Sequence, residues 1–229
     1  MLLLSTLQRA LPAFAAAAIA LAFSGTLVLA NVDLDRMERL ALGRHGPNTA
    51  DTVARWRSLI DEISALSDVE KVERVNNFFN TLVRWRQDIE VWGRNDYWAT
   101  PLELMARREG DCEDFSIAKY MTLLLAGIEV EQMRITYVKA QISGDARNAT
   151  QAHMVLAYYP TPAAEPLILD NMVSEVRPAS RRPDLRPVFG FNSQGLWVGA
   201  AAAPATRDPG ARLSRWHDLL QRIAADGLG

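Results

Sequence analysis

The amino-acid sequence predicts an α+β fold, with helices in the first half of the chain and an antiparallel sheet in the second. In the first half, apolar residues recur at helical spacing over residues 34–83. In the second half, residues 133–140 alternate with β-branched and aromatic side chains, as strands do. The turn-rich sequence PTPAA at residues 160–164 separates two further strand-like runs and indicates a hairpin.

Composition and charge indicate a globular protein and exclude one class of partner. Hydrophobic residues make up 49% of the 229-residue chain and charged residues 23%, so the chain is too apolar to be disordered. Its length suits one domain, or one domain with a small additional lobe. The net charge of −2 lacks the basic footprint that nucleic-acid binding requires, so we expect no nucleic-acid partner.

Residues 1–30 differ from the rest of the chain. Arg9 is their only charged side chain, and an apolar run from Ala10 to Ala30 follows it. A positive start, an apolar middle and small residues before a cleavage point after Ala30 are typical of a secretory signal peptide. The run is also long enough to span a bilayer, which takes about 20 apolar residues, so an uncleaved segment would be a membrane anchor. In both cases we expect an exported protein.

Three helices are expected in the first half. A glycine-proline pair at positions 46–47 separates the first two, and Ser67 or Asp68 can cap the third. The aromatic residues 83–101 follow no clear period and are interpreted as a loop. The three predicted helices span residues 31–45, 52–65 and 68–83.

The second half begins with a predicted helix over residues 112–126, which ends at Gly127. Three strands follow, and a polar loop over residues 141–150 separates the first from the second. Residues 199–210 are rich in alanine, proline and glycine and are interpreted as a linker to an amphipathic C-terminal helix. The predicted strands span residues 133–140, 153–159 and 165–170.

Cys112, the only cysteine of the chain, lies at the start of a predicted helix. Backbone N–H groups at a helix N-terminus favour an anion, so they can lower a thiol pKa or stabilise an oxyanion. The predicted hairpin can bring His153 and Asp170 side by side, as a base and its orienting carboxylate. Together the three residues indicate an apparatus for acyl transfer. Each also has a structural interpretation, because a lone cysteine is often a buried apolar residue and Asp170 could cap a turn.

Three acidic residues flank Cys112, and their charge opposes formation of a thiolate. Asp111 is a suitable N-cap and Asp114 follows three residues later, as in a capping box. This interpretation leaves Glu113 unexplained. The alternative is a bound Ca²⁺ ion, which favours clustered carboxylates and would cancel their charge. Zinc is less favoured because the sequence shows no Cys/His ligand spacing.

Five sequence blocks between residues 96 and 197 resemble, in order, the bacterial transglutaminase-like cysteine proteinases, and among them the periplasmic proteases of the LapG type. The most specific combination is GDCEDF at 110–115, followed by AHMV at 152–155 and LDN at 169–171. The helical first half of the chain is compatible with this family but less specific. The blocks are DYWATPLELMARREGDCEDFSIAKYMTLLLAGI, RITYVKA, AHMVLAYY, LILDNM and RRPDLRPVFGFNSQGLW.

The resemblance implies a papain/transglutaminase-like α+β fold, in which a helical lobe packs on an antiparallel sheet and the nucleophile starts the central helix. It implies a catalytic triad of Cys112, His153 and Asp170. The implied calcium ligands are Asp111, Glu113 and Asp114.

The expected domain division follows the same resemblance. Residues 1–30 are a signal peptide or membrane anchor, and residues 31–200 are a transglutaminase-like cysteine protease domain. Within that domain, the helical lobe covers about 31–127 and the sheet lobe about 128–200. Residues 201–229 form a linker and a C-terminal amphipathic helix.

The resemblance also implies a function in the periplasm. The expected substrate is a very large surface adhesin, cut near its N-terminus at a double-alanine site, so that the biofilm cell is released. The expected partner is an inner-membrane LapD-like receptor that binds cyclic di-GMP and sequesters the protease. Trp92, Tyr97 and Trp98 could form a wall of the substrate site or a receptor patch, or could pack between the lobes. Two other functions stay open: a transglutaminase-type acyltransferase, and a non-catalytic calcium-dependent binding module.

Overall fold

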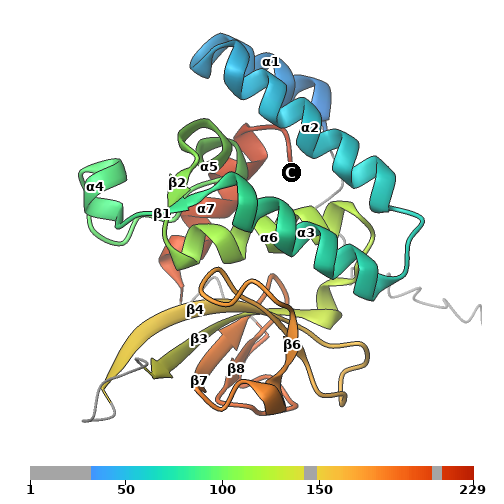
Figure 1. The fold of residues 1–229 in the computed structure, drawn as a ribbon, viewed down its shortest axis with the longest axis vertical. Helices are drawn as coiled ribbons and strands as arrows, with labels where there is room; N and C mark the ends of the chain where they lie inside the picture. Colours follow the sequence, from blue (N-terminus) through green and yellow to red (C-terminus); the bar gives the residue numbers. More distant parts are fainter. Residues whose placement is uncertain (1–31, 142–148, 208–212) are drawn as a thin grey trace, which may run out of the picture.

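The structure of the protein is a computed structural model that describes residues 32–141, 149–207 and 213–229, and it consists of a helical layer packed on a β-sheet (Figure 1). The helices are α1 (Leu34–His45), α2 (Pro47–Ile63), α3 (Asp68–Leu82), α4 (Asp88–Trp92), α5 (Pro101–Arg107), α6 (Cys112–Leu125) and α7 (Ser214–Ala225), with 3₁₀ turns η1 (Val130–Gln132) and η2 (Ala179–Arg181). The strands are β1 (Arg84–Trp85), β2 (Glu109–Gly110), β3 (Met133–Gln141), β4 (Thr150–Tyr158), β5 (Leu167–Leu169), β6 (Arg177–Pro178), β7 (Leu185–Phe191) and β8 (Leu196–Val198).

The main sheet has six strands in the order β6-β5-β4-β3-β7-β8, and all neighbouring strands are antiparallel. The hairpin predicted between the second and third strands is present, with Leu156 of β4 opposite Leu169 of β5. This register carries the chain after Leu169 back along β4 toward His153. β1 and β2 form a separate parallel pair.

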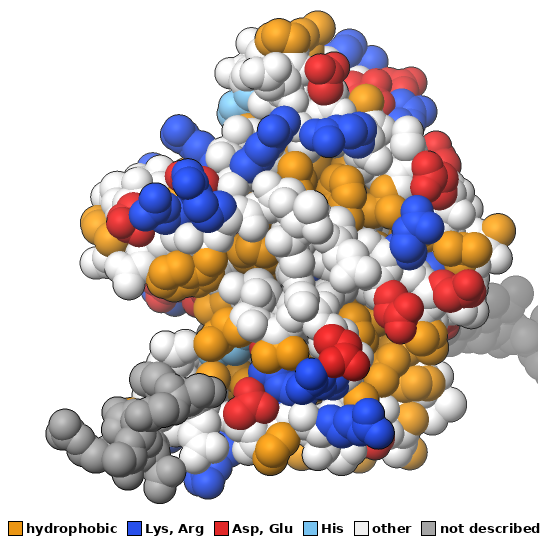
Figure 2. All heavy atoms as spheres, viewed as in Figure 1, with side chains coloured by type: hydrophobic (Ala, Val, Ile, Leu, Met, Phe, Trp, Pro, Cys, Tyr) orange, Lys and Arg blue, Asp and Glu red, His pale blue; other side chains and the backbone are white. Residues whose placement is uncertain are grey.

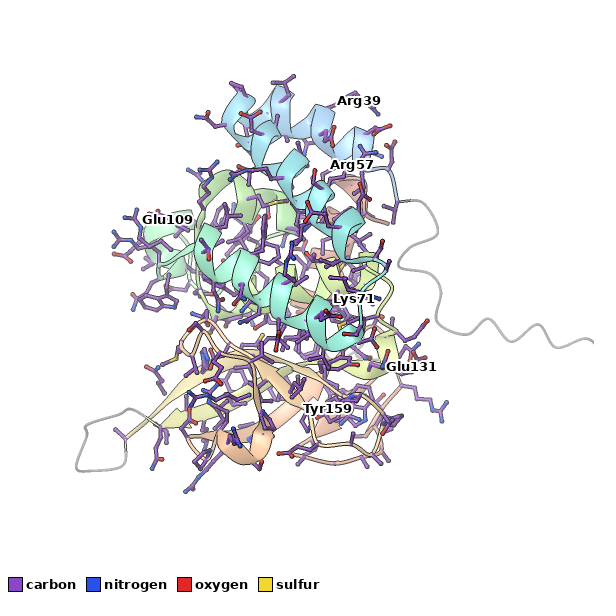
Figure 3. The ribbon with its side chains drawn as sticks, turned by 45° about the vertical axis from the view of Figure 1, so that its right-hand side comes forward. Arg39, Arg57, Lys71, Glu109, Glu131 and Tyr159 are labelled. Atoms are coloured by element: carbon purple, nitrogen blue, oxygen red, sulfur yellow. The ribbon has the colours of Figure 1, made fainter. Side chains whose placement is uncertain are left out.

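The first two helices form a hairpin at the top of the view in Figure 1. Gly46 has a positive φ of 86°, which suits glycine, and Pro47 occupies the first position of α2, where its missing N–H costs no hydrogen bond. On the surface, Arg57 of α2 pairs with Asp35 and Glu38 of α1 (Figure 3). The glycine-proline pair therefore joins two helices directly.

α6 is the central helix of the fold. Its residues from Asp114 to Leu124 are all buried, because α2, α3 and α5 cover one side of the helix and β4 lies against the other. An α-helix that is apolar on all sides is expected to be buried in this way. α7 also packs into the core, where the Trp216 ring lies edge-on to Tyr120 of α6 and Phe191 of β7, with centroids 5.9 and 5.3 Å apart.

Residues 83–101 contain more regular secondary structure than the predicted loop, because β1 and α4 lie within them. α5 follows at Pro101, after a capping box between Thr100 and Glu103. These elements are too short to display a hydrophobic period. Trp98 is buried and stacks on Phe191, with ring centroids 5.7 Å apart, so this aromatic residue packs between the helical layer and the sheet.

β7 and β8 complete the sheet and were not predicted as strands. Pro187 and Gly190 interrupt the strand pattern of β7, since proline lacks a ladder donor and glycine weakens a strand. The structure accommodates this segment with an irregularity in the pairing of β3 with β7, between Tyr137 and Val138. A proline next to such an irregularity is a common way to keep a strand in a sheet.

Three predicted segments lie wholly or partly outside the described residues. They are the signal peptide or anchor at 1–30, most of the loop at 141–150 and part of the linker at 199–210. Within residues 32–141, 149–207 and 213–229, every helix is too short or too polar to cross a membrane.

Candidate active site

A cleft of about 510 Å³ lies where the start of α6 meets β4, and it brings together Cys112 and His153. Figure 2 shows the surface hollowed at its left edge, between α4 and the sheet, with hydrophobic side chains at the rim. Asp111 and Glu113 also line this cleft, which we call the Cys112 cleft. The rest of its wall comes from Trp85, Gln87, Gln151, Ala152, Asn171 and Met172.

Asp170 lies directly behind His153, as the predicted hairpin requires. Its Oδ1 is 2.8 Å from Nε2 of His153 and accepts a hydrogen bond of 2.9 Å from the Met172 N–H. Its Oδ2 accepts a hydrogen bond of 2.7 Å from Arg182. Burial opposes the negative charge, but the hydrogen bonds from His153, Met172 and Arg182 outweigh it and lower the pKa of Asp170 to about 2.

A buried lysine supports the loop that carries Asp170. Lys119 of α6 donates hydrogen bonds of 2.8 Å to the side-chain oxygens of Asn76 and Asn80. Asn80 in turn donates to the backbone oxygen of Asp170, at 2.7 Å. Burial lowers the pKa of Lys119 to about 7, and the negative charge of Asp170 opposes that shift. The position of Asp170 is therefore fixed from α3 and α6 as well as from Arg182.

Cys112 occupies the first position of α6, after the N-cap Asp111. The Asp111 side chain accepts a hydrogen bond from the Glu113 N–H, and Asp114 accepts one from the Asp111 N–H, so the predicted capping box is present. The thiol donates to Oε2 of Glu113 at 2.8 Å. Burial raises the pKa of the Cys112 thiol, and the charges of Glu113 and Asp111 raise it further. Without a compensating cation, this site opposes the thiolate.

A fourth acidic residue joins the three that the sequence places beside Cys112. Asp88, at the start of α4, lies with Asp111 and Asp114 so that one carboxylate oxygen of each is within 4.8 Å of the others. Asp111, Cys112 and Glu113 form a second group of the same kind. We call Asp88, Asp111, Glu113 and Asp114 the acidic cluster.

Asp88 and Asp114 of the acidic cluster are buried, Asp111 and Glu113 are half-buried, and the charges of the cluster are poorly balanced. Burial raises the pKa of Asp88 to about 6, that of Asp114 to about 8 and that of Asp111 to about 10, with the Glu113 charge adding to each shift. Asp88 is 6% exposed and its Oδ1 is buried without a hydrogen-bond partner. Clustered carboxylate oxygens with an unsatisfied member are the donor set that Ca²⁺ prefers, so these residues fit a calcium ion.

Sequence reasoning missed Asp88 because it lies 23 positions before Asp111 in the segment interpreted as a loop. The available local signal was the capping box between Gln87 and Glu90, which marks the start of α4 but gives no ligand role to Asp88. Only the packing of this turn against the start of α6 brings Asp88 into the acidic cluster.

Comparisons with known proteins agree with this geometry. Residues 53–183 match the family model of the bacterial transglutaminase-like cysteine proteinases. No curated protein sequence matches the chain. The solved structure of Legionella pneumophila LapG is 37% identical, with a TM-score of 0.70, over 84% of this chain and 98% of that one.

Two further structures of Legionella pneumophila LapG, one EGTA-treated and one calcium-bound, are similar to the same extent. Their TM-scores are 0.72 and 0.71, at 37% identity, and they cover 84% of this chain and 98% and 99% of theirs. The expected papain/transglutaminase-like α+β fold is confirmed by these matches. The chain therefore belongs to the bacterial transglutaminase-like cysteine proteinases and is a cysteine peptidase of the LapG type.

Proposed function

We propose that this protein is a calcium-dependent periplasmic endopeptidase that cleaves a large surface adhesin near its N-terminus, at a double-alanine site. One observation carries the proposal: Cys112 at the start of α6 shares a cleft with His153, which is hydrogen-bonded to Asp170, in a chain of the LapG type. Cleavage would release the adhesin and promote dispersal of the biofilm.

In the proposed mechanism, Asp170 fixes the ring of His153. Because Nε2 of His153 is paired with Asp170, Nδ1 is the nitrogen that remains to take the thiol proton of Cys112. The thiolate then attacks the carbonyl carbon of the scissile peptide, and a thioester forms as the C–N bond breaks. His153 returns its proton to the leaving amine and then activates the water that hydrolyses the thioester.

The start of α6 supplies the groups that stabilise negative charge. Backbone N–H groups in the first turn of a helix have no intrahelical acceptor, so the N–H of Cys112 can donate to the oxyanion of the tetrahedral intermediate. Calcium, held by Asp111, Glu113, Asp114 and Asp88, would supply the positive charge that offsets the acidic cluster beside the thiol. The calcium-bound and EGTA-treated forms of Legionella pneumophila LapG support a calcium site in this family.

The proposed location and control of the enzyme depend on the N-terminal sequence and the family. The apolar run after Arg9 supports export, either as a cleaved signal peptide or as an inner-membrane anchor. We propose that a LapD-like inner-membrane receptor, which binds cyclic di-GMP in the cytoplasm, sequesters the protease. A pull-down of the protein by the full receptor, with and without cyclic di-GMP, tests this partner.

A cleavage assay tests the enzyme, the nucleophile and the metal together. The protein is incubated with an N-terminal adhesin fragment as wild type, as Cys112→Ala, and as wild type in excess chelator. We expect a single cut by the wild type, no cut by the variant, and restoration of the chelated enzyme by calcium but not magnesium, which needs tighter octahedral geometry. Cleavage that persists in excess chelator would contradict the calcium requirement.

An added primary amine separates hydrolysis from acyl transfer. A transglutaminase would use the amine to resolve the acyl-enzyme, so it would label or cross-link the fragment without cutting the chain. We expect cleavage products of unchanged amount when the amine is present. Cross-linking without cleavage would contradict the peptidase proposal.

A further inference from the structure

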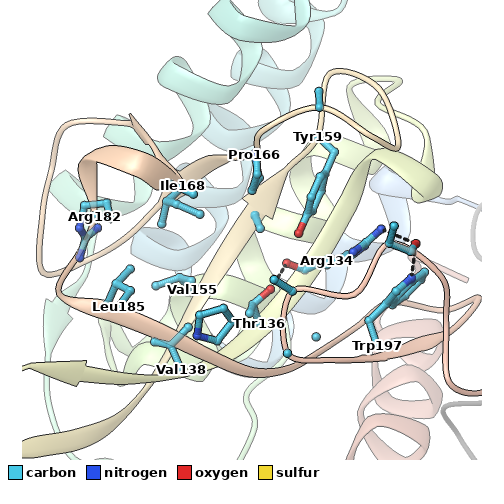
Figure 4. A pocket seen from close by; sticks show the side chains of 18 of the residues that line it. Arg134, Thr136, Val138, Val155, Tyr159, Pro166, Ile168, Arg182, Leu185 and Trp197 are labelled. Atoms are coloured by element: carbon cyan, nitrogen blue, oxygen red, sulfur yellow. Dashed lines mark hydrogen bonds between the residues drawn. The ribbon is translucent and has the colours of Figure 1, made fainter.

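A second cavity, of about 250 Å³, lies on the face of the main sheet that the helices do not cover (Figure 4). Its floor is a separate hydrophobic cluster that comprises Val138, Val155, Ala157 and Ile168. A cavity of about 150 Å³ can hold benzene, and drug-sized ligands occupy about 300–1,000 Å³. This outer-face cavity is therefore large enough for a small apolar molecule.

The charges around the outer-face cavity have one sign. Among the described residues, Arg134 and Arg182 line it and no acidic side chain does. Figure 4 places Arg182 at one end and Arg134 at the other. Arg182 is already neutralised, because it pairs with Asp170 and Asp184 at 2.7 and 2.8 Å. Nη1 of Arg182 is also buried without a hydrogen-bond partner, but the charge of Arg182 is already paired, so Arg134 is the arginine whose charge a ligand would balance.

Arg134 is 5% exposed and forms no ion pair with any acidic residue that the structure describes. Its guanidinium carbon lies 4.3 Å from the ring centroids of both Tyr159 and Trp197. It donates to the backbone oxygens of Ala201 and Ala202, at 3.0 and 3.5 Å. Its Nε is buried without a hydrogen-bond partner.

A buried arginine without a counter-ion is rare, because its charge loses hydration without a compensating partner. The rings of Tyr159 and Trp197 both lie against the Arg134 guanidinium, and the carbonyls of Ala201 and Ala202 accept hydrogen bonds from its outer nitrogens. The unsatisfied Nε therefore marks the place where an acceptor is missing. An anionic oxygen there would provide both the hydrogen bond and the missing charge.

We propose that the outer-face cavity binds a small apolar carboxylate, whose apolar body covers Val155 and Ile168 and whose carboxylate accepts a hydrogen bond from Nε of Arg134. The cavity lies close along the chain to the proposed catalytic pair, because Val155 comes two residues after His153 in β4 and Ile168 comes two residues before Asp170, which follows β5. A fatty acid and the C-terminal residue of a peptide share this chemistry.

Isothermal titration calorimetry of the full chain tests the proposal, with octanoate, N-acetylleucine and 1-octanol as probes. We expect one site for at least one carboxylate, bound at least 10-fold more tightly than octanol, since the alcohol has no charge for Arg134. Tighter binding of octanoate indicates a fatty acid, and tighter binding of N-acetylleucine indicates a peptide C-terminus. Absence of binding by both carboxylates, or equal binding of octanoate and octanol, overturns the proposal.

Three variants locate the site. Arg134→Met should weaken binding of the carboxylate at least 10-fold and leave octanol binding unchanged, whereas Arg186→Met, at an exposed arginine of β7, should change neither. Ala157→Leu fills the floor of the cavity and should abolish binding while preserving thermal stability and peptidase activity. Ala157→Leu also keeps the test decisive if Arg134→Met does not fold. Carboxylate binding that survives Ala157→Leu unchanged overturns the proposal.

Discussion

The acidic cluster and the group formed by His153, Asp170 and Arg182 lie at the same cleft, but their charges are balanced differently. In the acidic cluster, four carboxyl groups meet without an ion pair to any lysine or arginine among the described residues. In the second group, Arg182 and His153 satisfy both oxygens of Asp170. The environment of the acidic cluster raises the pKa values of Asp88, Asp111 and Asp114, whereas the hydrogen bonds of the second group lower the pKa of Asp170.

The difference shows which half of the site is complete in the folded chain. His153 and Asp170, the proposed base and its orienting carboxylate, are held by protein contacts alone, including the network from Lys119 through Asn80. Cys112, the proposed nucleophile, is not made reactive by protein contacts alone, because burial and the neighbouring acids disfavour its thiolate. We infer that the protein positions His153 by folding and depends on a cation to make Cys112 reactive.

The largest expected effect comes from removing the proposed nucleophile, which tests whether both groups serve one reaction. Cys112→Ala should lower kcat/KM for the adhesin fragment by about 10⁴-fold or more, because the covalent step is lost. The calcium-induced rise in Tm should be unchanged in this variant, since the carboxylates remain. Cleavage within tenfold of the wild-type rate would show that Cys112 is not the nucleophile.

The next largest effect is expected from breaking the pair between Arg182 and Asp170. Arg182→Gln leaves the buried Asp170 without its cation and should destabilise the protein by roughly 3–5 kcal/mol, as measured by urea denaturation. Asp184→Asn is the matched control, because it removes the more exposed partner of Arg182 and leaves Asp170 paired. Its expected cost is smaller, about 1 kcal/mol or less. Equal losses in the two variants would contradict a special role for the Arg182–Asp170 pair.

The distance along the chain between contacting residues explains which features the sequence could predict. Features that depend on residues close together in the chain are visible in the sequence. Examples are the capping box that places Cys112 at the start of α6 and the hairpin that brings Asp170 to His153. The three long N-terminal helices were also predictable from their periods and caps, such as Ser67 with Glu70 at the start of α3.

Features that depend on distant packing left no such pattern. Asp88 joins Asp111 only because a short helical turn folds back onto the start of α6. Arg182 reaches Asp170 from the segment after η2, in a region without predicted elements. β7 could not be predicted because Pro187 and Gly190 interrupt its strand pattern, although it pairs with β3 along much of its length.

Calcium should bind the acidic cluster and leave the group formed by His153, Asp170 and Arg182 unchanged. We expect it to raise the stability of the wild type by about 2.7 kcal/mol at 100 times its Kd, because it binds the folded cluster. Asp88→Asn should weaken calcium binding about 10- to 100-fold, a cost typical of changes around a metal site. Glu109→Gln, at an acid of β2 outside the acidic cluster, should leave affinity unchanged in calorimetric titration. Unaltered affinity in Asp88→Asn would remove Asp88 from the ligand set.

The last prediction concerns the pH dependence of stability, whose sign differs between the acidic cluster and Asp170. The pKa values of Asp88, Asp114 and Asp111 are raised from about 4 to about 6, 8 and 10, so each stabilises the calcium-free protein fully below about pH 4. That stability is lost as the pH rises through the folded pKa of each residue. The pKa of Asp170 is lowered to about 2, so its contribution to stability is present above about pH 4 and is lost as the pH falls toward 2.

Thermal unfolding in chelator should therefore show a Tm that falls between pH 5 and 8, and saturating calcium should flatten this slope. A Tm in chelator that rises over this range would show that ionisation of the acidic cluster does not destabilise the folded protein. That outcome would contradict the inference that the cluster needs a cation.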